Sequence, residues 1–383
     1  MTVTVPAGFR AAGVAAGLKT SGNPDVALVV NDGPDDAAAA VFTTNRFPAA
    51  PVQWSRQVLS GGRLKAVVLN SGGANACTGP EGFQDTHATA EHVAAELGIG
   101  AIDVAVASTG LIGVRLPMDK LLPGVSAAVA RLSADGGTAA AQAIMTTDSV
   151  PKTTVVRREG WTVGGIAKGA GMLAPSLATM LVVLTTDAVV PAEVLQAALA
   201  RATSVSVERV DSDGCLSTND TVVAMASGAG GVTPTAEEVT EALTAAMTDL
   251  AMQLLADAEG STKDIAITVR NAASVADALT AGRACARNNL LKTALFGNDP
   301  NWGRVLAAIG TTDAAFEADQ VDVTINGVTV CRGGAIGDPR EGVDLSGRAI
   351  AIEVDLRAGT EEATIWTNDL SIAYVHENSA YST

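Results

Sequence analysis

Short apolar runs alternate with helical segments along most of the chain, and this alternation constrains the fold more than any other feature. The runs typical of buried strands include Lys65–Asn70, Asp103–Ser108, Thr179–Thr185 and Thr221–Ala226. The segments typical of helices include Thr86–Leu97, Pro191–Ala202 and Thr235–Ala256. Apolar runs also flank the turn residues Glu159-Gly160 and Asn326-Gly327, which predicts antiparallel hairpins. We therefore predict an α/β fold with mixed sheets.

The composition limits what can fill the core and what the surface can bind. The chain has 383 residues, of which 48% are apolar but only 3% are aromatic, so small aliphatic side chains must supply most of the core. This length suits two domains or one large α/β unit. The 41 acidic residues outnumber the 25 basic ones, and the net charge is −16. An acidic surface repels nucleic acids and anionic membranes, which argues against both as partners.

Cysteine and histidine are sparse. Four cysteines are scattered along the chain without a CxxC pair, which predicts buried free thiols in a reducing compartment. The three histidines lack the spacing of zinc ligands, so we expect no metal site. The first residues do not resemble a signal peptide, and no run reaches the roughly 18 apolar residues of a membrane span. Together these features predict a cytoplasmic protein.

The stretch from Lys168 to Leu181 is rich in glycine and contains the pair Ala178-Thr179 directly before an apolar run. This layout suits a chain that cuts its own backbone before Thr179. The freed threonine would carry a hydroxyl nucleophile and an α-amine, whose ordinary pKa of about 7.7–8.0 lets it act as a base near neutral pH. Glycine supplies the unusual backbone conformations that such a cleavage needs. The alternative is an ordinary glycine-rich turn before a buried strand.

Two other glycine-rich turns follow predicted strands. The turn Ser108–Gly113 could direct backbone N–H groups and the Thr109 hydroxyl toward a developing oxyanion, or it could be a plain exit from the strand. The turn Asn70–Cys77 could form a backbone nest for an anion, or it could be a tight connection.

Three isolated polar features are ambiguous by themselves. Lys168 could bind a substrate carboxylate or lower the pKa of the threonine amine, although a single lysine is more often solvated. Glu259 follows the long helix Thr235–Ala256, where a negative charge is unfavourable for the helix dipole, and this hints at a functional role. The C-terminal residues Asn378–Thr383 have the composition of a frayed polar tail.

In their order along the chain, these motifs closely resemble the ornithine acetyltransferase family of arginine biosynthesis, also called glutamate N-acetyltransferase. The resemblance covers nearly the whole chain. The matching motifs are Gly8–Lys19, Asn70-Ser71-Gly72, Ser108–Gly113, Met145–Asp148, Lys168–Leu181, Asp257–Lys263, Asn298–Arg304 and His376–Thr383. One departure from the family pattern is Gly73, where asparagine is frequent.

The resemblance implies a role for each matching residue. Thr179 would be the nucleophile, released by self-cleavage after Ala178, and Thr109 with Gly110 would form the oxyanion hole. The residues implied to contact the amino-acid substrate are Thr146, Lys168, Thr179, Glu259, Asn378 and Thr383. Residues 1–178 would form an alpha chain and residues 179–383 a beta chain. Two alpha and two beta chains would then assemble.

The resemblance also implies the fold and the reaction. The fold would be two packed sheets flanked by helix layers, arranged as in N-terminal-nucleophile hydrolases but with a different topology. The acetyl group of N2-acetyl-L-ornithine would pass to L-glutamate in a ping-pong reaction through an acetyl-Thr179 ester, without a cofactor or a metal. Some family members also accept acetyl-CoA as a co-substrate. The alternatives are a self-processing aminopeptidase or amidase of related fold, and an amino-acid-binding protein without catalysis.

Overall fold

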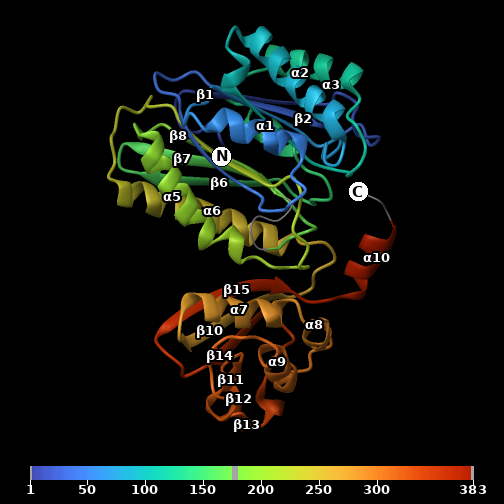
Figure 1. Cartoon of the computed structure of the whole chain (residues 1–383), viewed down its shortest axis with the longest axis vertical. Helices are drawn as coiled ribbons and strands as arrows, with labels where there is room; N and C mark the ends of the chain where they lie inside the picture. The colour runs from blue at the N-terminus through green and yellow to red at the C-terminus, as the bar shows by residue number, and fades with distance from the viewer. Residues whose placement is uncertain (1, 175–179, 381–383) are drawn as a thin grey trace.

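The computed structural model describes residues 2–174 and 180–380, which form a larger and a smaller lobe (Figure 1). In these ranges the strands build three sheets, of four, five and six strands. The first two sheets belong to the larger lobe, and the third forms the smaller lobe (Figure 1).

The first sheet of the larger lobe has the strand order β1-β2-β4-β5. Its strands are β1 (Phe9–Val14), β2 (Val26–Asn31), β4 (Ala66–Asn70) and β5 (Val104–Ser108). β4 and β5 run parallel, whereas the other neighbours are antiparallel. The helices connected to this sheet are α1 (Ala50–Leu59), α2 (Gly79–Leu97), α3 (Met118–Ala130) and α4 (Gly137–Ala143).

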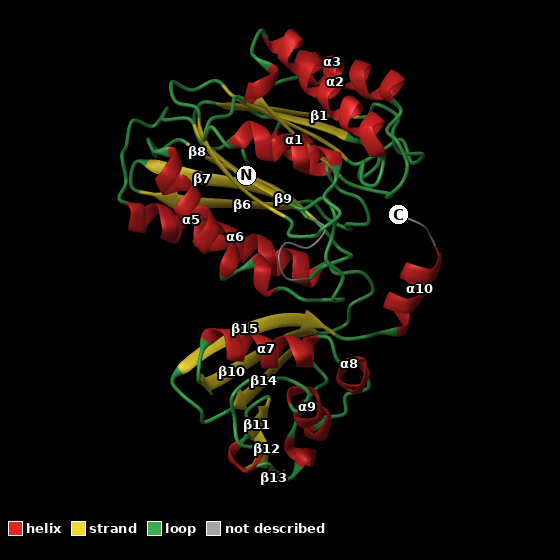
Figure 2. Ribbon diagram, viewed as in Figure 1, coloured by secondary structure: helices red, strands yellow, loops and turns green. Residues whose placement is uncertain are grey.

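The second sheet has the order β3-β9-β8-β7-β6. Its strands are β3 (Ala37–Phe42), β6 (Lys152–Arg158), β7 (Trp161–Lys168), β8 (Leu181–Thr186) and β9 (Thr221–Ala226). β8 is parallel to β9 and antiparallel to β7, with Leu181 opposite Lys168. The helices α5 (Ala192–Ser204) and α6 (Ala236–Ala256) lie along the outer face of this sheet (Figure 2).

The two sheets of the larger lobe pack face to face between helix layers. Successive residues of β8 point to opposite faces, as in any strand. Leu181 and Val183 enter the core between the sheets, whereas Val182 and Leu184 enter the core against α5 and α6. A strand buried on both faces is continuously apolar, which explains the run that follows Thr179. The predicted α/β class, with two packed sheets between helix layers, is confirmed for this lobe.

The smaller lobe adds a third sheet, with the order β13-β12-β11-β14-β10-β15. Its strands are β10 (Asp264–Ala272), β11 (Asp322–Ile325), β12 (Val328–Arg332), β13 (Ala335–Ile336), β14 (Ala349–Asp355) and β15 (Glu361–Asn368). Its helices are α7 (Val275–Ala286), α8 (Asn289–Phe296) and α9 (Trp302–Ile309). The last helix, α10 (Ile372–Ala380), leaves this lobe and extends beside the larger one (Figure 1).

Some elements differ from the sequence predictions. α2 begins at Gly79 rather than Thr86, because Pro80 is well suited to the first helical turn, where its missing N–H has no partner to lose. Asn378 lies in helix α10, so the predicted frayed tail is wrong as far as Ala380.

The cysteines also differ in part from the sequence prediction. All four are free, but only Cys285 and Cys331 are buried, whereas Cys77 and Cys215 are exposed. The expectation of buried thiols is therefore wrong for two of them. None of the helices in the described ranges is both long and apolar enough to cross a membrane.

Candidate active site

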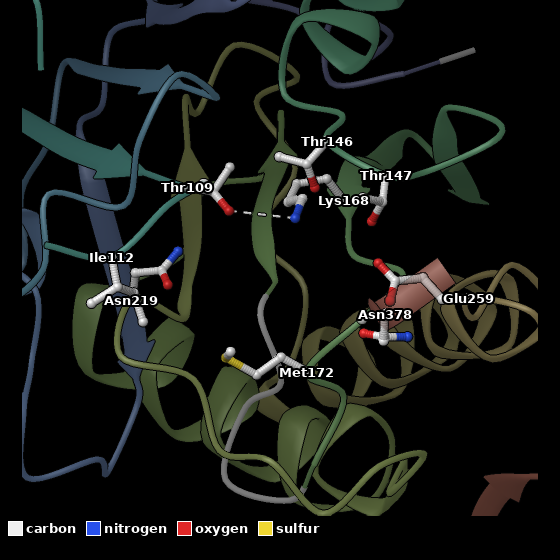
Figure 3. A pocket seen from close by; sticks show the side chains of 11 residues that line it. Thr109, Ile112, Thr146, Thr147, Lys168, Met172, Asn219, Glu259 and Asn378 are labelled. Carbon is white, nitrogen blue, oxygen red and sulfur yellow. Dashed lines mark hydrogen bonds between the residues drawn. The ribbon is translucent and has the colours of Figure 1, made fainter. Parts of the chain in front are cut away.

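A small cavity forms where β5, β7 and the chain after α6 come together (Figure 3). Its volume is about 100 Å³. The residues that line it are Thr109, Gly110, Ile112, Thr146, Thr147, Lys168, Gly171, Met172, Asn219, Glu259 and Asn378. They come from segments that are far apart in the sequence, so the cavity is a product of the tertiary fold.

The turn after β5 presents hydrogen-bond donors to this cavity. The Thr109 N–H donates to the Asn70 carbonyl at 2.9 Å, so Thr109 can serve an oxyanion only through its hydroxyl. Gly110 has φ +128°, and a Cβ there would lie 2.9 Å from the Gly73 nitrogen, so this position requires glycine. Within residues 2–174 and 180–380, no acceptor takes the Gly110 N–H. The turn therefore offers one hydroxyl and one backbone N–H to a bound carbonyl oxygen.

Lys168, the last residue of β7, places a buried amine beside this turn. Its side chain is 2% exposed, and its Nζ donates to the Thr109 Oγ1 at 3.4 Å (Figure 3). Because Thr109 accepts this bond, its own hydroxyl proton can turn toward the cavity. Burial lowers the pKa of Lys168 below its ordinary value, and the nearby Asp148 carboxylate opposes that shift. The alternative of a solvated lysine is excluded by this burial.

Asp148 organises the backbone around Lys168. Its carboxylate accepts hydrogen bonds from the Gly169 N–H at 2.7 Å, the Thr146 N–H at 2.9 Å and the Lys152 ammonium at 2.7 Å. Lys152 is itself fully buried and also contacts Asp257 at 2.5 Å. Burial alone would raise the pKa of Asp148, but the charges of Lys168 and Lys152 and the bond from Gly169 lower it to about 2. Asp148 therefore remains ionised at neutral pH and fixes two segments of the cavity wall.

Glu259 and Asn378 lie on the side of the cavity opposite Thr109 (Figure 3). The Glu259 N–H donates to the Ala170 carbonyl at 2.9 Å, which joins the chain after α6 to the glycine-rich segment. A Cβ on Gly171 would lie 2.6 Å from the Glu259 Oε2, so glycine at this position makes room for the carboxylate. Asn378 reaches the cavity from α10. The cavity therefore has an amine on one wall and a carboxylate on another, which suits an amino acid.

The structure brings together most of the predicted site. Six predicted residues line the one cavity: Thr109, Gly110, Thr146, Lys168, Glu259 and Asn378. Ala178, Thr179 and Thr383 lie outside the described residues, so their predicted roles stay predictions. In the turn Asn70–Cys77, the Ser71 and Ala74 N–H groups donate to the Asp25 and Leu111 carbonyls at 3.0 and 3.1 Å, which favours a tight connection over an anion nest. The Asn75 amide in it is buried and donates to the Gly82 carbonyl and the Thr86 hydroxyl, at 2.8 and 2.9 Å.

Sequence reasoning missed four residues of the cavity wall: Ile112, Gly171, Met172 and Asn219. Thr147, the alternative to Thr146 in the family motif, also lines the cavity. Ile112, Gly171 and Met172 lie within matching motifs, so proximity in sequence is an available signal. Asn219 has no such signal, because it stands alone before the apolar run of β9. Only the fold brings it to the turn after β5, where its Nδ2 donates to the Ser108 carbonyl at 2.8 Å.

Comparison with known proteins agrees with the family resemblance of the motifs. The profile of the ArgJ family matches residues 10–383. The "Arginine biosynthesis bifunctional protein ArgJ" of Streptomyces avermitilis is 65% identical over 382 residues, covering 100% of both chains. The protein of the same name from Thermobifida fusca is 63% identical over 383 residues, again covering 100% of both. These matches confirm the resemblance that the ordered motifs indicated.

A solved structure is also similar to part of this chain. It is the crystal structure of an ornithine acetyltransferase complexed with ornithine, from Mycobacterium tuberculosis. The match has 63% sequence identity and a TM-score of 0.45, and it covers 47% of this chain and 96% of the other.

Replacing Asp148 with asparagine should destabilise the protein at neutral pH more than in acid. The pKa of Asp148 is lower when folded (about 2) than its ordinary 3.8, so ionisation stabilises the fold above pH 3.8. That contribution, roughly 2 kcal/mol, is lost as the pH falls toward 2. Urea unfolding of the wild type and Asp148→Asn, near neutral pH and near pH 3, measures the difference.

The matched control is Asp338→Asn, which breaks an exposed ion pair with Arg332. Exposed pairs contribute about 0–1 kcal/mol, so this variant should stay close to the wild type at both pH values. If Asp148→Asn lost no more stability than Asp338→Asn, the buried carboxylate would not have the structural role assigned to it.

Proposed function

Because the chain belongs to the ArgJ family and is an acyltransferase of arginine biosynthesis, we propose that it transfers the acetyl group of N2-acetyl-L-ornithine to L-glutamate. The products are L-ornithine and N-acetyl-L-glutamate. The observation that carries the proposal is the cavity itself, where two oxyanion donors, a buried amine and a carboxylate lie together. Such a set can polarise an amide carbonyl while it holds the charged groups of an amino acid.

The proposed nucleophile is Thr179, freed by autocatalytic cleavage of the Ala178–Thr179 bond. Support comes from the register of the neighbouring strands. Leu181, two positions after Thr179 in the sequence, pairs with Lys168, which lines the cavity. The chain therefore enters β8 beside the backbone of Lys168, whose amine contacts Thr109.

The first half-reaction forms an ester. The Thr179 Oγ attacks the acetyl carbonyl carbon of N2-acetylornithine, and its proton passes to the free α-amine of the same residue. The carbonyl oxygen becomes an oxyanion that the Thr109 hydroxyl and the Gly110 N–H stabilise. When the C–N bond breaks, the α-amine returns the proton to the leaving nitrogen. Ornithine departs and an acetyl-Thr179 ester remains.

The second half-reaction repeats these steps with glutamate. Its deprotonated amine attacks the ester carbonyl, the same donors stabilise the oxyanion, and the Thr179 oxygen leaves and regains its proton. Both substrates carry an α-carboxylate, and we propose that Lys168 and Thr146 bind this shared group. Glu259, Asn378 and Thr383 would contact the rest of the amino acid. An amide is exchanged for an amide, so the reaction needs no metal or nucleotide.

Three further parts of the proposal concern the setting of the reaction. The protein works in the cytoplasm as two alpha and two beta chains, and acetyl-CoA serves as an alternative acetyl donor. Incubating the protein with glutamate and acetyl-CoA, without acetylornithine, tests the last point. Formation of N-acetylglutamate supports a bifunctional enzyme, and its absence limits the enzyme to acetyl recycling.

The sheet order supports the proposal that the two halves stay together after cleavage. In the order β3-β9-β8-β7-β6, strands from residues 1–178 lie on both sides of the pair β9-β8 from residues 179–383. The β3–β9 and β7–β8 ladders both cross between the halves. Separation would break these ladders and open both cores of the larger lobe.

Thr179→Ala should leave the chain uncut and abolish acetyl exchange, because it removes the attacking oxygen. Thr179→Ser keeps a hydroxyl and is the matched control, which should still be cut and active. Denaturing gels measure the cleavage, and the formation of acetylglutamate from acetylornithine and glutamate measures the exchange. Cleavage and turnover in Thr179→Ala would contradict the assignment. Release of free acetate faster than acetylglutamate would favour the aminopeptidase or amidase alternative.

Thr109→Ala should lower kcat by about 10²–10³, the usual cost of losing one oxyanion donor. The backbone should be unaffected, because the Thr109 N–H bond to Asn70 does not involve the side chain. Thr109→Ser, which keeps the hydroxyl, is the control and should retain most of the activity. Steady-state kinetics with acetylornithine distinguish the two, and an unchanged kcat in Thr109→Ala would remove the hydroxyl from this role.

The cleaved protein should run as two fragments on a denaturing gel, of 178 residues and of the remaining 205 of the 383. Without denaturant, both fragments should elute together in size-exclusion chromatography, at the same volume as the uncut Thr179→Ala protein. Separate elution of the fragments in native buffer would show that the shared sheet does not hold the halves together.

A further inference from the structure

The dipeptide Asn219-Asp220 bonds to two segments of the site, the end of β5 and the start of β8. It lies directly before β9, and Asn219 is on the cavity wall (Figure 3). The Asn219 Nδ2 donates to the carbonyl of Ser108, the residue before the oxyanion turn, at 2.8 Å. The Asp220 Oδ1 accepts from the N–H of Met180, the residue after Thr179, at 3.1 Å. Adjacent side chains therefore hold both segments.

Met180 is held on both sides of its backbone. Its N–H bonds to the Asp220 side chain, and its carbonyl accepts from the Thr221 N–H at 3.1 Å. The Met180 side chain is fully buried in the core against α5 and α6. The residue that follows Thr179 in the chain thus has little freedom to move. A displacement of about 1 Å at a reacting group can lower a rate by about 10²-fold, so this restraint matters for catalysis.

The surroundings of Asp220 favour a neutral carboxylic acid over a carboxylate. The side chain is fully buried, and burial raises its pKa well above the ordinary value, against the bond from Met180. The neighbouring hydroxyls of Thr43 and Ser217 donate elsewhere, to the Ser217 carbonyl at 2.6 Å and to the Asn219 Oδ1 at 2.8 Å. Across the described residues, no donor satisfies the Asp220 Oδ2. A protonated Oδ2 would itself be a donor, and either hydroxyl oxygen could accept from it.

We infer that Asn219 and Asp220 are positioning residues that together set the nucleophile of the proposed reaction against the oxyanion turn. Asn219 fixes the end of β5, and Asp220 fixes the start of β8. Neither residue exchanges a proton with substrate. The inference rests on the proposed role of Thr179, and it assigns a function to a dipeptide that no motif in the sequence marks.

The test compares two substitutions of Asp220 with a matched control. Asp220→Ala removes the acceptor for the Met180 N–H and should lower kcat by about 10²-fold, with the KM for acetylornithine within about 2-fold of wild type. Asp220→Asn keeps a neutral side chain with an acceptor oxygen, so it should restore most of kcat. Rescue by this substitution distinguishes positioning from general-base chemistry, which asparagine cannot perform.

The control is Asp187→Ala, at the far end of the same strand. Asp187 follows β8, is also buried, and accepts from the Ala7 and Thr162 N–H groups at 3.1 and 2.7 Å. It does not line the cavity, so its loss should lower the melting temperature without changing kcat. If Asp220→Ala lowered kcat only because the protein is less stable, Asp187→Ala should lower kcat as well.

Asn219→Ala supplies an independent arm if Asp220→Ala fails to fold. It removes the bond to the Ser108 carbonyl and should lower kcat through the oxyanion turn while leaving Met180 held. If Asn219→Ala or Asp220→Ala kept a kcat as high as that of Asp187→Ala, the inference would be overturned. It would also be overturned if Asp220→Asn were as inactive as Asp220→Ala. Failure of the proposed function is distinguishable, because it would appear as turnover in Thr179→Ala.

Discussion

The pairing of β7 with β8 is the contact on which the site depends. β7 ends at Lys168 on the cavity wall, and β8 begins at its register partner Leu181. Both strands are interior to a five-stranded sheet, and β8 packs into a core on each face. Their positions are therefore set by backbone hydrogen bonds and by close packing on both sides. A cut in the segment that connects them would leave this pairing intact, so the same framework can serve before and after cleavage.

A second requirement is to keep charged groups in a dry interior. Burying a charge is costly unless an opposite charge and hydrogen bonds compensate for it. The negative charge of Asp148 compensates for the buried charges of Lys168 and Lys152. Asp257, at the end of α6, forms a second ion pair with Lys152. The bonds from Asp148 to the Thr146 and Gly169 N–H groups connect this charge balance to the shape of the cavity. The same network therefore stabilises the buried lysines and fixes the backbone of the cavity wall.

The sequence was most informative where local chemistry determines structure. The glycine at position 110 was predicted to lie in a turn, and its positive φ with the close approach of Gly73 shows why glycine is needed there. Glu259 was suspected because its charge opposes the helix dipole, and the structure places it on the cavity wall. Local composition was misleading where distant segments decide the outcome. It marks the tail at Asn378 as a frayed end, yet Asn378 is helical and lines the cavity, as the resemblance of the motifs implied.

By itself the sequence determined the α/β class, the positions of the buried strands and, through the order of its motifs, the family. These follow from periodicity, turn chemistry and motif order, which are properties of short segments. Only the tertiary structure decided how Thr109, Lys168 and Glu259 reach one cavity, that the side chains of Asn219 and Asp220 bond to Ser108 and Met180, and that strands from residues 1–178 flank the pair β9-β8 in one sheet. The physical reason is that contacts between distant segments depend on sheet order and register, which no local pattern encodes.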